Sequence, residues 1–397
     1  MTALDGVRVV EAGLLVQGPQ AAAMLGLLGA EVIKVELPNI GDQSRWLPVA
    51  PAHGDFRSAF FIACNRGKRS LSLDLRSERG REAFLRLIET ADVLITNFQP
   101  GTMDGWGLGY DVLSARNPGL VYAAGSAFGA LGPDASRTGA DLSAQASGGL
   151  IHGTGTDDGE PTPVAVTIAD HISSQNLVVG ILAALFARNA TGRGQRVDVS
   201  LLGSQIWAQA SEYTYFLLRG SGPGRSNKGH PMIGAIYGIF PTSDGWIAVV
   251  GVIGPQRAAF YELLGRPELT DDARFGSPLL DEPQKAELFP ILSDAFRART
   301  TAEWCALLAA ADIRHAPVRD YAAVAADPQV WENGYLRAVA ADDGTEVRVV
   351  GSPIMLSESP AQVAAAAPEL GQHTEEVLLE LGYSWDDIGE LRDAGAF

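Results

Sequence analysis

The sequence predicts an α/β fold with a parallel sheet in a large domain, followed by a smaller α+β domain. Strand-like and helix-like segments alternate over the first half of the chain, and the strands are rich in Val, Ile and Leu. Strands of that composition are typical of parallel sheets covered by helices on both faces. The composition changes abruptly at GSGPGRSNKG (220–229), which indicates a domain boundary.

The elements of the large domain follow from hydrophobic periodicity and from turn residues. We expect strands at 6–13, 31–36, 70–75, 91–98, 120–129 and 195–201. We expect helices after the first strand and at 77–90, 110–116, 171–190 and 202–219. In a sheet of this kind, ligands bind at the carboxyl ends of the strands.

The region after residue 230 predicts the smaller domain. Two apolar strands flank Asp244-Gly245, a hairpin turn, and helices are expected near 254–264, 284–299 and 301–311. From about residue 325 the chain resumes with DPQVWENG, two strands and a last helix at 371–382.

Composition excludes several classes of partner. The 397 residues include 30 Lys and Arg against 47 Asp and Glu, a formal net charge of −17, which opposes binding to nucleic acid or to anionic membranes. Apolar runs such as 177–187 are shorter than the ~20 residues that span a bilayer. The N-terminus starts with a strand-like segment instead of a basic and then apolar leader, so we expect a cytoplasmic protein. Two cysteines, Cys64 and Cys305, form no disulfide framework, and the histidines lack metal-ligand spacing, so no metal is expected.

One motif resembles a nucleotide-binding loop without meeting its requirements. GTGTDDG (153–159) has GxGxxxG spacing and no strand directly before it. We therefore interpret it as a turn.

Asp170 lies directly before the long apolar helix that we expect at 171–190. Aspartate is a preferred N-cap, so a structural role explains it. The same position also suits catalysis, because the unsatisfied N–H groups and the positive dipole end of a helix keep a carboxylate ionised. An ionised carboxylate held out of bulk water can attack a thioester carbonyl. The two interpretations are compatible.

A basic cluster stands out against the acidic background. NRGKRSLSLDL (65–75) places Arg66, Lys68 and Arg69 beside a strand end, where a phosphate-bearing ligand would need them, although a solvated loop explains them equally. NFQPG (97–101) and QGPQ (17–20) also follow strands, and their backbone N–H groups could bind phosphate or pantetheine oxygens.

Taken together, these segments resemble the class III CoA-transferase family, which includes formyl-CoA and carnitine CoA-transferases and the related α-methylacyl-CoA racemases. The resemblance covers essentially the whole chain, in this order: QGPQAAAMLGLLGAEVIKVE, GDQSR, NRGKRSLSLDL, NFQPGTMDGWGL, DLSAQASGG, TIADHISSQN, ATGRGQRVDVSL, DGWIAVV, DPQVWENG and LGQHTEEVLLELG. It implies a Rossmann-like large domain (1–205 and 326–397), a linker helix and Gly-rich loop (206–230), a small domain (231–325) and an interlocked homodimer.

The resemblance also implies site residues. Asp170 matches the nucleophilic aspartate of the family, and Asp141 matches an acidic residue that flanks its active site. The segments that bind coenzyme A in the family correspond to Val16, Gln17, Lys68, Arg69, Leu73, Leu75, Asn97 and Phe98. Gly-rich residues 220–229 lie where transferases carry a loop that shields the intermediate. Coenzyme A is then a co-substrate, and the protein binds an acyl-CoA and a small carboxylic acid.

Departures from the family pattern narrow the expected activity. Racemases of the family have a histidine where this chain has Ala140, which disfavours a two-base racemase. An acyl-CoA racemase or epimerase that uses Asp170 and the neighbouring His171 stays an alternative. Two arginines of some transferases are replaced by Leu37 and Gly105, so phosphate binding must rely on Lys68, Arg69, Arg45 or Arg137. The loop is less Gly-rich than in oxalate-related members, which argues against a formyl or oxalyl substrate. A catalytically inactive acyl-CoA-binding relative is the third alternative.

Overall fold

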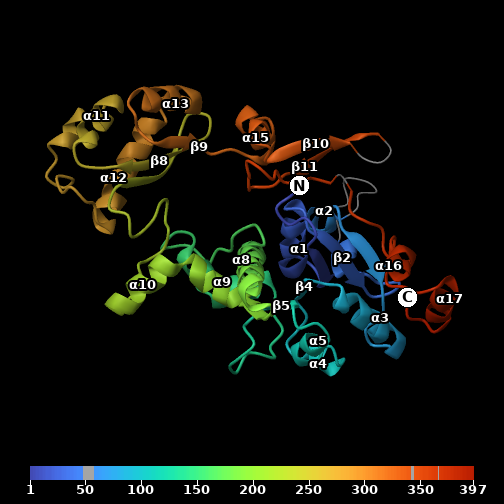
Figure 1. The fold of residues 1–397 in the computed structure, drawn as a ribbon. Coiled ribbons are helices and arrows are strands. Elements are labelled where there is room, and N and C mark those ends of the chain that lie inside the picture. Colours follow the sequence, from blue (N-terminus) through green and yellow to red (C-terminus); the bar gives the residue numbers. More distant parts are fainter. Residues whose placement is uncertain (48–57, 341–343, 365) are drawn as a thin grey trace. The chain divides into compact units, whose positions relative to one another are not determined.

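The computed structural model describes residues 1–47, 58–340, 344–364 and 366–397. They form two compact units (Figure 1). Unit 1 comprises the described residues of Met1–Gly148, Ala165–Ala208 and Pro328–Phe397, and unit 2 comprises Gly149–Val164 and Gln209–Asp327. The excursion Gly149–Val164 into unit 2 has no counterpart in the boundaries expected from the sequence.

Unit 1 is built on a six-stranded parallel sheet with the order β3-β2-β1-β4-β5-β6, which confirms the predicted parallel α/β architecture. This is the Rossmann order, with the reversal between β1 and β4. Each predicted strand is present. The second coincides with its prediction, the third begins one residue earlier and ends three residues earlier, and the others are one to three residues shorter at each end. The strands are β1 (Arg8–Ala12), β2 (Glu31–Glu36), β3 (Arg69–Ser72), β4 (Val93–Thr96), β5 (Val121–Ser126) and β6 (Arg196–Ser200).

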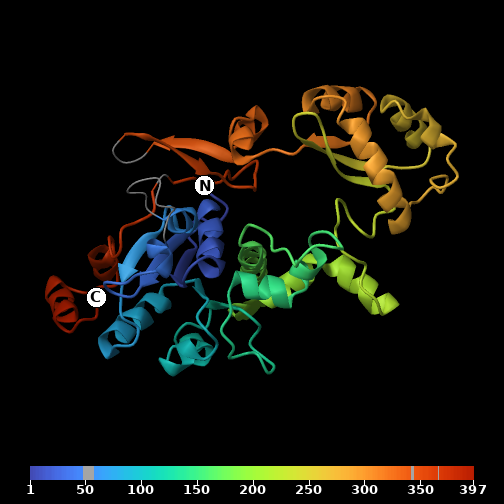
Figure 2. The ribbon, with the colours of Figure 1, turned by 180° about the vertical axis from the view of Figure 1, so that it is seen from behind.

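Helices cover both faces of this sheet. One face packs against α3 (Glu78–Glu89), α5 (Tyr110–Arg116), α16 (Thr374–Glu380) and α17 (Trp385–Asp393) through a shared apolar core. The other face packs against α1 (Gln17–Leu27) and α8 (Ile168–Thr191). In both views, the C-terminal helices lie beside β3 and α3, so segments far apart in the sequence build one layer (Figures 1 and 2). The sequence pattern did not predict α17.

Two long helices differ from expectation. Helix α8 begins at Ile168, three residues earlier than expected, and by length and composition it could cross a membrane. Its residues Leu177, Val178, Ile181 and Ala184 instead pack on the sheet. The single helix expected over 202–219 is two helices, α9 (Leu201–Ala208) and α10 (Ala210–Arg219), because Gln209 has non-helical dihedral angles of −109° and 31°.

Unit 2 contains a three-stranded antiparallel sheet covered by helices. The predicted hairpin is present as β7 (Ile236–Pro241) and β8 (Trp246–Val252), and β9 (His315–Pro317) adds a third strand that was not predicted. Helices α11 (Gln256–Leu263), α12 (Glu282–Phe296) and α13 (Thr301–Ala310) bury a core rich in aromatic rings, including Phe240, Phe260, Phe296 and Trp304.

The remaining elements are short. A separate hairpin in unit 1 pairs β10 (Leu336–Ala340) with β11 (Glu346–Val350). The other helices are η1 (Gln43–Trp46), α2 (Ala59–Asn65), α4 (Thr102–Gly105), α6 (Asp141–Ser147), α7 (Leu150–Gly153), η3 (Pro267–Thr270), α14 (Tyr321–Ala325) and α15 (Pro328–Glu332).

Candidate active site

The loops after β1 and β4 meet where the strand order reverses, which is the usual ligand-binding point of such a sheet. Asn97 fixes the β1–α1 loop from both sides: its Oδ1 accepts from Leu14 N at 2.8 Å, and its Nδ2 donates to Leu14 O at 2.8 Å. Leu15 has a left-handed φ of 64°, which is costly for a leucine, and its N–H donates to Asp42 Oδ1 at 3.0 Å. The loop is therefore held in one strained conformation.

Two glycines allow this close approach. A Cβ atom at Gly13 would lie 2.8 Å from Asn97 Oδ1, and one at Gly125 in β5 would lie 2.4 Å from Gln17 Oε1. Both distances are shorter than carbon and oxygen atoms tolerate without moving. Gln17 is buried, and its Nε2 donates to Ser173 Oγ at 2.6 Å, which ties α1 to α8.

A cavity of about 230 Å³ opens beside these loops. It brings together five of the site residues expected from the sequence, from four parts of the chain: Gln17, Asn97, Phe98, Arg137 and Asp170. Asp141 does not line it but contacts the backbone of Asp170 from α6. Ala140 does line it, at the position where racemases have histidine.

The expected N-cap role of Asp170 is wrong, because Asp170 lies in the first turn of α8 and not before it. Asp141 supplies the cap instead. Its Oδ1 accepts from Ala169 N at 2.7 Å and from Asp170 N at 3.3 Å, while its Oδ2 accepts from Gln145 Nε2 at 2.6 Å. Two of the N–H groups that a helix start leaves unsatisfied are thus bound by a carboxylate from another helix. The carboxylate of Asp170 remains available.

Burial of Asp170, followed by the negative charge of Asp141, raises the pKa of Asp170 to about 7. The expectation that the helix start would keep this carboxyl ionised therefore overlooked the stronger effects, because removal from water and a like charge both favour the protonated form. At neutral pH the protonated and ionised forms are comparably populated. A perturbed carboxyl in a cavity is a candidate for chemistry.

The backbone of Asp170 is also tied to α1. Ser174 Oγ lies 2.8 Å from Asp170 O and 2.7 Å from Gln17 O. The first turn of α1 has no side-chain cap, so the N–H groups of Gln17 and Gly18 are donors without a helical acceptor. The aspartate and the start of α1 thus belong to one rigid assembly.

A second cavity, of about 210 Å³, shares Leu14 and Phe98 with the first. The expected residues Leu73 and Leu75 line it. Most of its exposed surface is apolar, and Trp106 packs edge-on against Phe98, with 5.3 Å between ring centroids. Arg76 also lines it, two residues beyond an aspartate with which it pairs at 2.8 Å. Sequence reasoning missed Arg76 and Trp106, although Arg76 follows directly on the SLSLDL strand segment.

The other expected coenzyme A residues lie elsewhere. Val16 is buried at the start of α1 and lines neither cavity. The three cations Arg45, Lys68 and Arg69 do not line them either, and each is engaged by internal carboxylates. The structure therefore does not bring these residues together with Asp170.

Lys68 belongs to a buried charge network beneath the β1–α1 loop. Its ammonium is 2.7 Å from Glu11 Oε2, and Lys34 Nζ lies 2.8 Å from Glu11 Oε1 and 2.9 Å from Asp42 Oδ2. Arg45 pairs with Glu36 at 2.7 Å, next to the same network. Arg69 pairs instead with glutamates on β2 and α16. Lys34 also donates to Gly13 O at 3.1 Å, and Lys68 donates to Pro19 O at 2.9 Å, so the two lysines hold the backbone on both sides of the loop.

His171 is half-buried beside Asp170 in sequence, but it does not line the cavity, because consecutive helical residues point in different directions. Burial lowers the pKa of its imidazole, against the opposing influence of Asp141. Within the described ranges, no group of three or more His, Cys, Asp or Glu side chains is arranged to hold a metal ion.

Comparison with known proteins shows the family of the chain. A family model described as CoA-transferase family III matches residues 4–374. The chain is 35% identical to the succinate–glutarate CoA-transferase of Agrobacterium fabrum (95% of each chain) and 34% identical to the succinyl-CoA–L-malate CoA-transferase beta subunit of Chloroflexus aurantiacus (98% of this chain, 96% of the relative). The crystal structure of a CAIB/BAIF family protein from Brucella suis superimposes with a TM-score of 0.84 at 36% identity, covering 96% of this chain and 99% of that one. The chain therefore belongs to CoA-transferase family III and is an enzyme of that family.

Proposed function

We propose that this enzyme transfers coenzyme A from an acyl-CoA to a carboxylic acid through covalent intermediates on Asp170. The observation that carries the proposal is the available, half-buried carboxyl of Asp170 in a cavity beside the uncapped start of α1. Such a carboxyl is a nucleophile that water does not solvate fully.

The first half of the reaction loads the enzyme. Ionised Asp170 attacks the thioester carbonyl, the C–S bond breaks, and CoA thiolate leaves an aspartyl anhydride behind. The thiolate then attacks the aspartyl carbonyl of the anhydride, which releases the donor carboxylate and forms an aspartyl-CoA thioester. The N–H groups of Gln17 and Gly18 could stabilise the oxyanion of each addition, because they have no helical acceptor.

The second half reverses these steps with another acid. The acceptor carboxylate attacks the aspartyl thioester, and CoA thiolate then attacks the acceptor side of the new anhydride. This regenerates the carboxylate of Asp170, and no net proton is taken up. The anhydride must be protected from water, and the Gly-rich loop 220–229 is the segment that we propose for this role.

We propose that the second cavity holds the adenine end of coenzyme A. Its walls of Leu73, Leu75, Phe98 and Trp106 suit a flat aromatic ring. Arg76 at this cavity and Arg137 at the first are the basic residues placed to meet phosphates. We assign Arg45, Lys68 and Arg69 to support of the fold instead, since their side chains are largely buried in their ion pairs. Arg76 and Arg137 are also paired, with Asp74 and Asp134, but these pairs are exposed to solvent and weak.

We also propose that the enzyme acts as a homodimer, with the interlocked arrangement implied by family resemblance. Large apolar side chains are exposed on unit 1, including Phe186 at 79% and Trp207 at 72%, and on unit 2, including Leu217 at 79%. We propose that these side chains contribute to the interface, since large exposed apolar patches mark protein–protein contacts. Light scattering of the purified chain would test this, and a monomer would contradict it.

The mechanism is tested by trapping. The enzyme is incubated with succinyl-CoA and then with hydroxylamine, and the peptide spanning 161–190 is mapped by mass spectrometry. We expect a hydroxamate on Asp170 in the wild type and none in Asp170→Asn. Turnover without any adduct on this peptide would refute the covalent relay.

An epimerase has less support. Ala140 and not histidine lines the cavity, and His171 lies outside it. Wash-in of deuterium at Cα of an acyl-CoA without an acceptor acid would favour the epimerase over transfer.

A further inference from the structure

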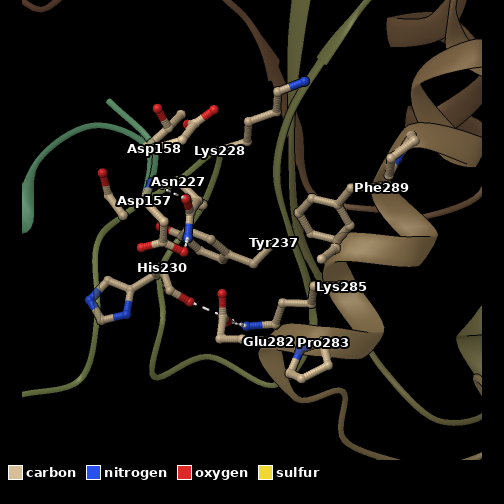
Figure 3. Close-up of a pocket in the computed structure, with 15 residues that line it drawn as sticks. Asp157, Asp158, Asn227, Lys228, His230, Tyr237, Glu282, Pro283, Lys285 and Phe289 are labelled. Carbon is tan, nitrogen blue, oxygen red and sulfur yellow. Dashed lines mark hydrogen bonds and ion pairs between the residues drawn. The ribbon is translucent and has the colours of Figure 1, made fainter. Parts of the chain in front are cut away.

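A cavity of about 480 Å³ in unit 2, drawn in Figure 3, is lined in part by residues 226–229 of the Gly-rich loop and by residues 156–158 of the turn motif. That loop is the segment proposed above to shield the intermediate, so this cavity goes with the transfer reaction. A different cavity, of about 210 Å³, lies in unit 1 and shares no lining residue with the two cavities of the candidate active site. No role described above uses it.

This cavity, which we call the amino-edge cavity, lies at the amino ends of β2 and β3, beside the second half of α1. Its lining comes from α1, from residues on either side of the first residue of β2, from residues 66–68 just before β3, and from residues 362–364. The cavity beside Asp170 lies instead where β1, β4 and β5 end. In a parallel sheet these are opposite edges, so the amino-edge cavity is a separate site.

Both charged residues that line the amino-edge cavity are positive, although the chain has a formal net charge of −17. Lys68 is balanced by Glu11, whose Oε2 lies 2.7 Å from the lysine ammonium. Arg66 is not balanced: its Nη2 donates to Val350 O at 2.7 Å, and no carboxylate in the part of the chain that the structure describes forms an ion pair with it. The cavity therefore contains one guanidinium without a counter-charge.

The surroundings of Arg66 make this charge costly. Arg66 is half-buried, and burial lowers the pKa of its guanidinium. A thiolate at Cys64 would oppose this effect, but burial raises the pKa of that thiol to about 12, so the thiol is uncharged at neutral pH. A partly desolvated cation without a counter-charge destabilises the protein, and a bound anion would remove that cost.

Backbone hydrogen bonds hold the walls of the cavity in place. Gly67 N donates to Ala366 O at 2.9 Å, and Gln362 N donates to Leu27 O at 2.8 Å, so the C-terminal segment is tied both to α1 and to the residues before β3. Leu27 and Val32 add apolar surface. Drug-sized ligands occupy cavities of roughly 300–1,000 Å³, so a cavity of about 210 Å³ suits a smaller molecule.

We propose that the amino-edge cavity binds a small oxyanion, a carboxylate or a phosphate, on the guanidinium of Arg66. A guanidinium presents parallel N–H groups that match two oxygens of either anion. The site lies at the opposite edge of the sheet from Asp170. The anion site and the covalent transfer proposed above can therefore each fail without the other.

The test measures how fast phenylglyoxal, a reagent that condenses with guanidinium groups, modifies Arg66 in the full-length protein. The modified peptides are mapped by mass spectrometry, at constant ionic strength, in the presence of propionate, propionamide or inorganic phosphate. With a Kd of about 10 mM, as suits so small a ligand, propionate at about 30 mM should slow the modification of Arg66 about 4-fold. Propionamide has the same shape without the charge and should leave the rate unchanged.

The two anions distinguish the source of the ligand. Stronger protection of Arg66 by propionate would assign the site to a carboxylic acid, and stronger protection by phosphate would assign it to a phosphate-bearing ligand. Either result supports the proposal. An Arg66 that phenylglyoxal does not reach, a rate that neither anion lowers, or equal protection by propionamide would overturn it.

Arg193 supplies the matched control, because it is exposed and lies outside the amino-edge cavity. In the same digest, neither anion should slow the modification of Arg193, and protection equal to that of Arg66 would refute a specific site. Arg66→Gln removes the uncompensated charge, so its unfolding midpoint without anions should equal or exceed that of the wild type. Propionate should raise that midpoint less than it raises the midpoint of the wild type or of Arg193→Gln, and an equal rise in Arg66→Gln would also overturn the proposal.

Discussion

The carboxylate of Asp141 has two effects: it caps the start of α8, and its negative charge raises the pKa of Asp170. We predict that Asp141→Asn will separate these two effects. The amide oxygen of asparagine can still accept from Ala169 N and Asp170 N, which now lie 2.7 and 3.3 Å from Asp141 Oδ1. The cap survives while the negative charge is removed. The new NH2 group faces Gln145, whose amide must rotate to present its oxygen.

The magnitude follows from the pKa of Asp170, which is raised from an ordinary 3.8 to about 7. That difference corresponds to about 4 kcal/mol between the two protonation states. Burial is the larger cause and the charge of Asp141 the smaller, so Asp141 accounts for less than half. We therefore expect Asp141→Asn to lower the pKa of Asp170 by about 1, which is about 1.4 kcal/mol.

The assay is the pH dependence of kcat/KM for succinyl-CoA, whose acidic limb reports the ionisation of the free enzyme. Asp170 must be ionised to attack, so the wild-type rate should fall below pH about 7, and the limb of Asp141→Asn should lie near pH 6. The other charged groups near the aspartate, Arg137 at the cavity and His171 on α8, are present in both proteins.

Asp141→Ala is the matched control, because it removes the charge and the cap together. Its acidic limb should move as far as that of Asp141→Asn, but its plateau should also be lower, since losing a cap costs about 1 kcal/mol and frees the start of α8. If the limb stays at the wild-type pH in either variant, or moves upward, the electrostatic reasoning is wrong.

Four further changes test other parts of the structure. Asp170→Asn should abolish transfer yet raise stability by as much as about 4 kcal/mol at pH 8, and less after solvent screening. A carboxyl with a raised folded pKa weakens the fold progressively as pH rises from its unfolded pKa near 4 to its folded pKa near 7, so the gain should vanish near pH 4, as urea unfolding at pH 8 and pH 4 would show. Arg76→Ala should raise KM for acyl-CoA about 5-fold and leave the unfolding midpoint unchanged, whereas an unchanged KM would remove Arg76 from the phosphate site. Lys68→Met should leave KM unchanged and cost about 3–5 kcal/mol of stability, because it removes one of the cations that balance the buried charge of Glu11. A Lys68→Met protein of unchanged stability with a raised KM would show instead that Lys68 binds a phosphate. Gly125→Ala should push Gln17 off Ser173 and lower kcat about 10-fold or more with little change in melting temperature, so retention of full activity would show that Gln17 does not position the site.

Local patterns predicted the sheet well, because most of its strands are short segments rich in Val, Ile and Leu that alternate with helical segments. Segments such as 31–36 coincide with β2, and the Asp244-Gly245 turn joins β7 to β8 as expected. Helix α17 was not predicted because it has few apolar residues among its acidic ones, so its burial depends on tertiary contacts. The break at Gln209 has no sequence signal either.

The site was harder to predict, because the sequence shows where charged residues stand along the chain but not which groups surround their side chains in the fold. Lys68 and Arg69 lie in a basic segment that would suit a phosphate, yet both form ion pairs with carboxylates that are distant in the sequence. Aspartate before an apolar helix indicated a cap at Asp170, whereas the cap comes from Asp141, and only the fold brings these two residues together. The raised pKa of Asp170 likewise depends on burial that no local pattern reports.

The charge network under the β1–α1 loop has a consequence for acid inactivation. Burial alone would raise the pKa of Asp42, but the Lys34 ammonium and the N–H groups of Leu15 and Ser44 outweigh it and hold that pKa below its ordinary value. Stability from such a carboxylate is present above its unfolded pKa and is lost as pH falls through the lower folded value, below about 4. Protonating Asp42 would also release the strained Leu15 from its acceptor. Loss of activity and loss of the fold should therefore be two separate transitions: activity should fall below pH about 7 as Asp170 is protonated, whereas tertiary circular dichroism should persist until the pH falls below about 4.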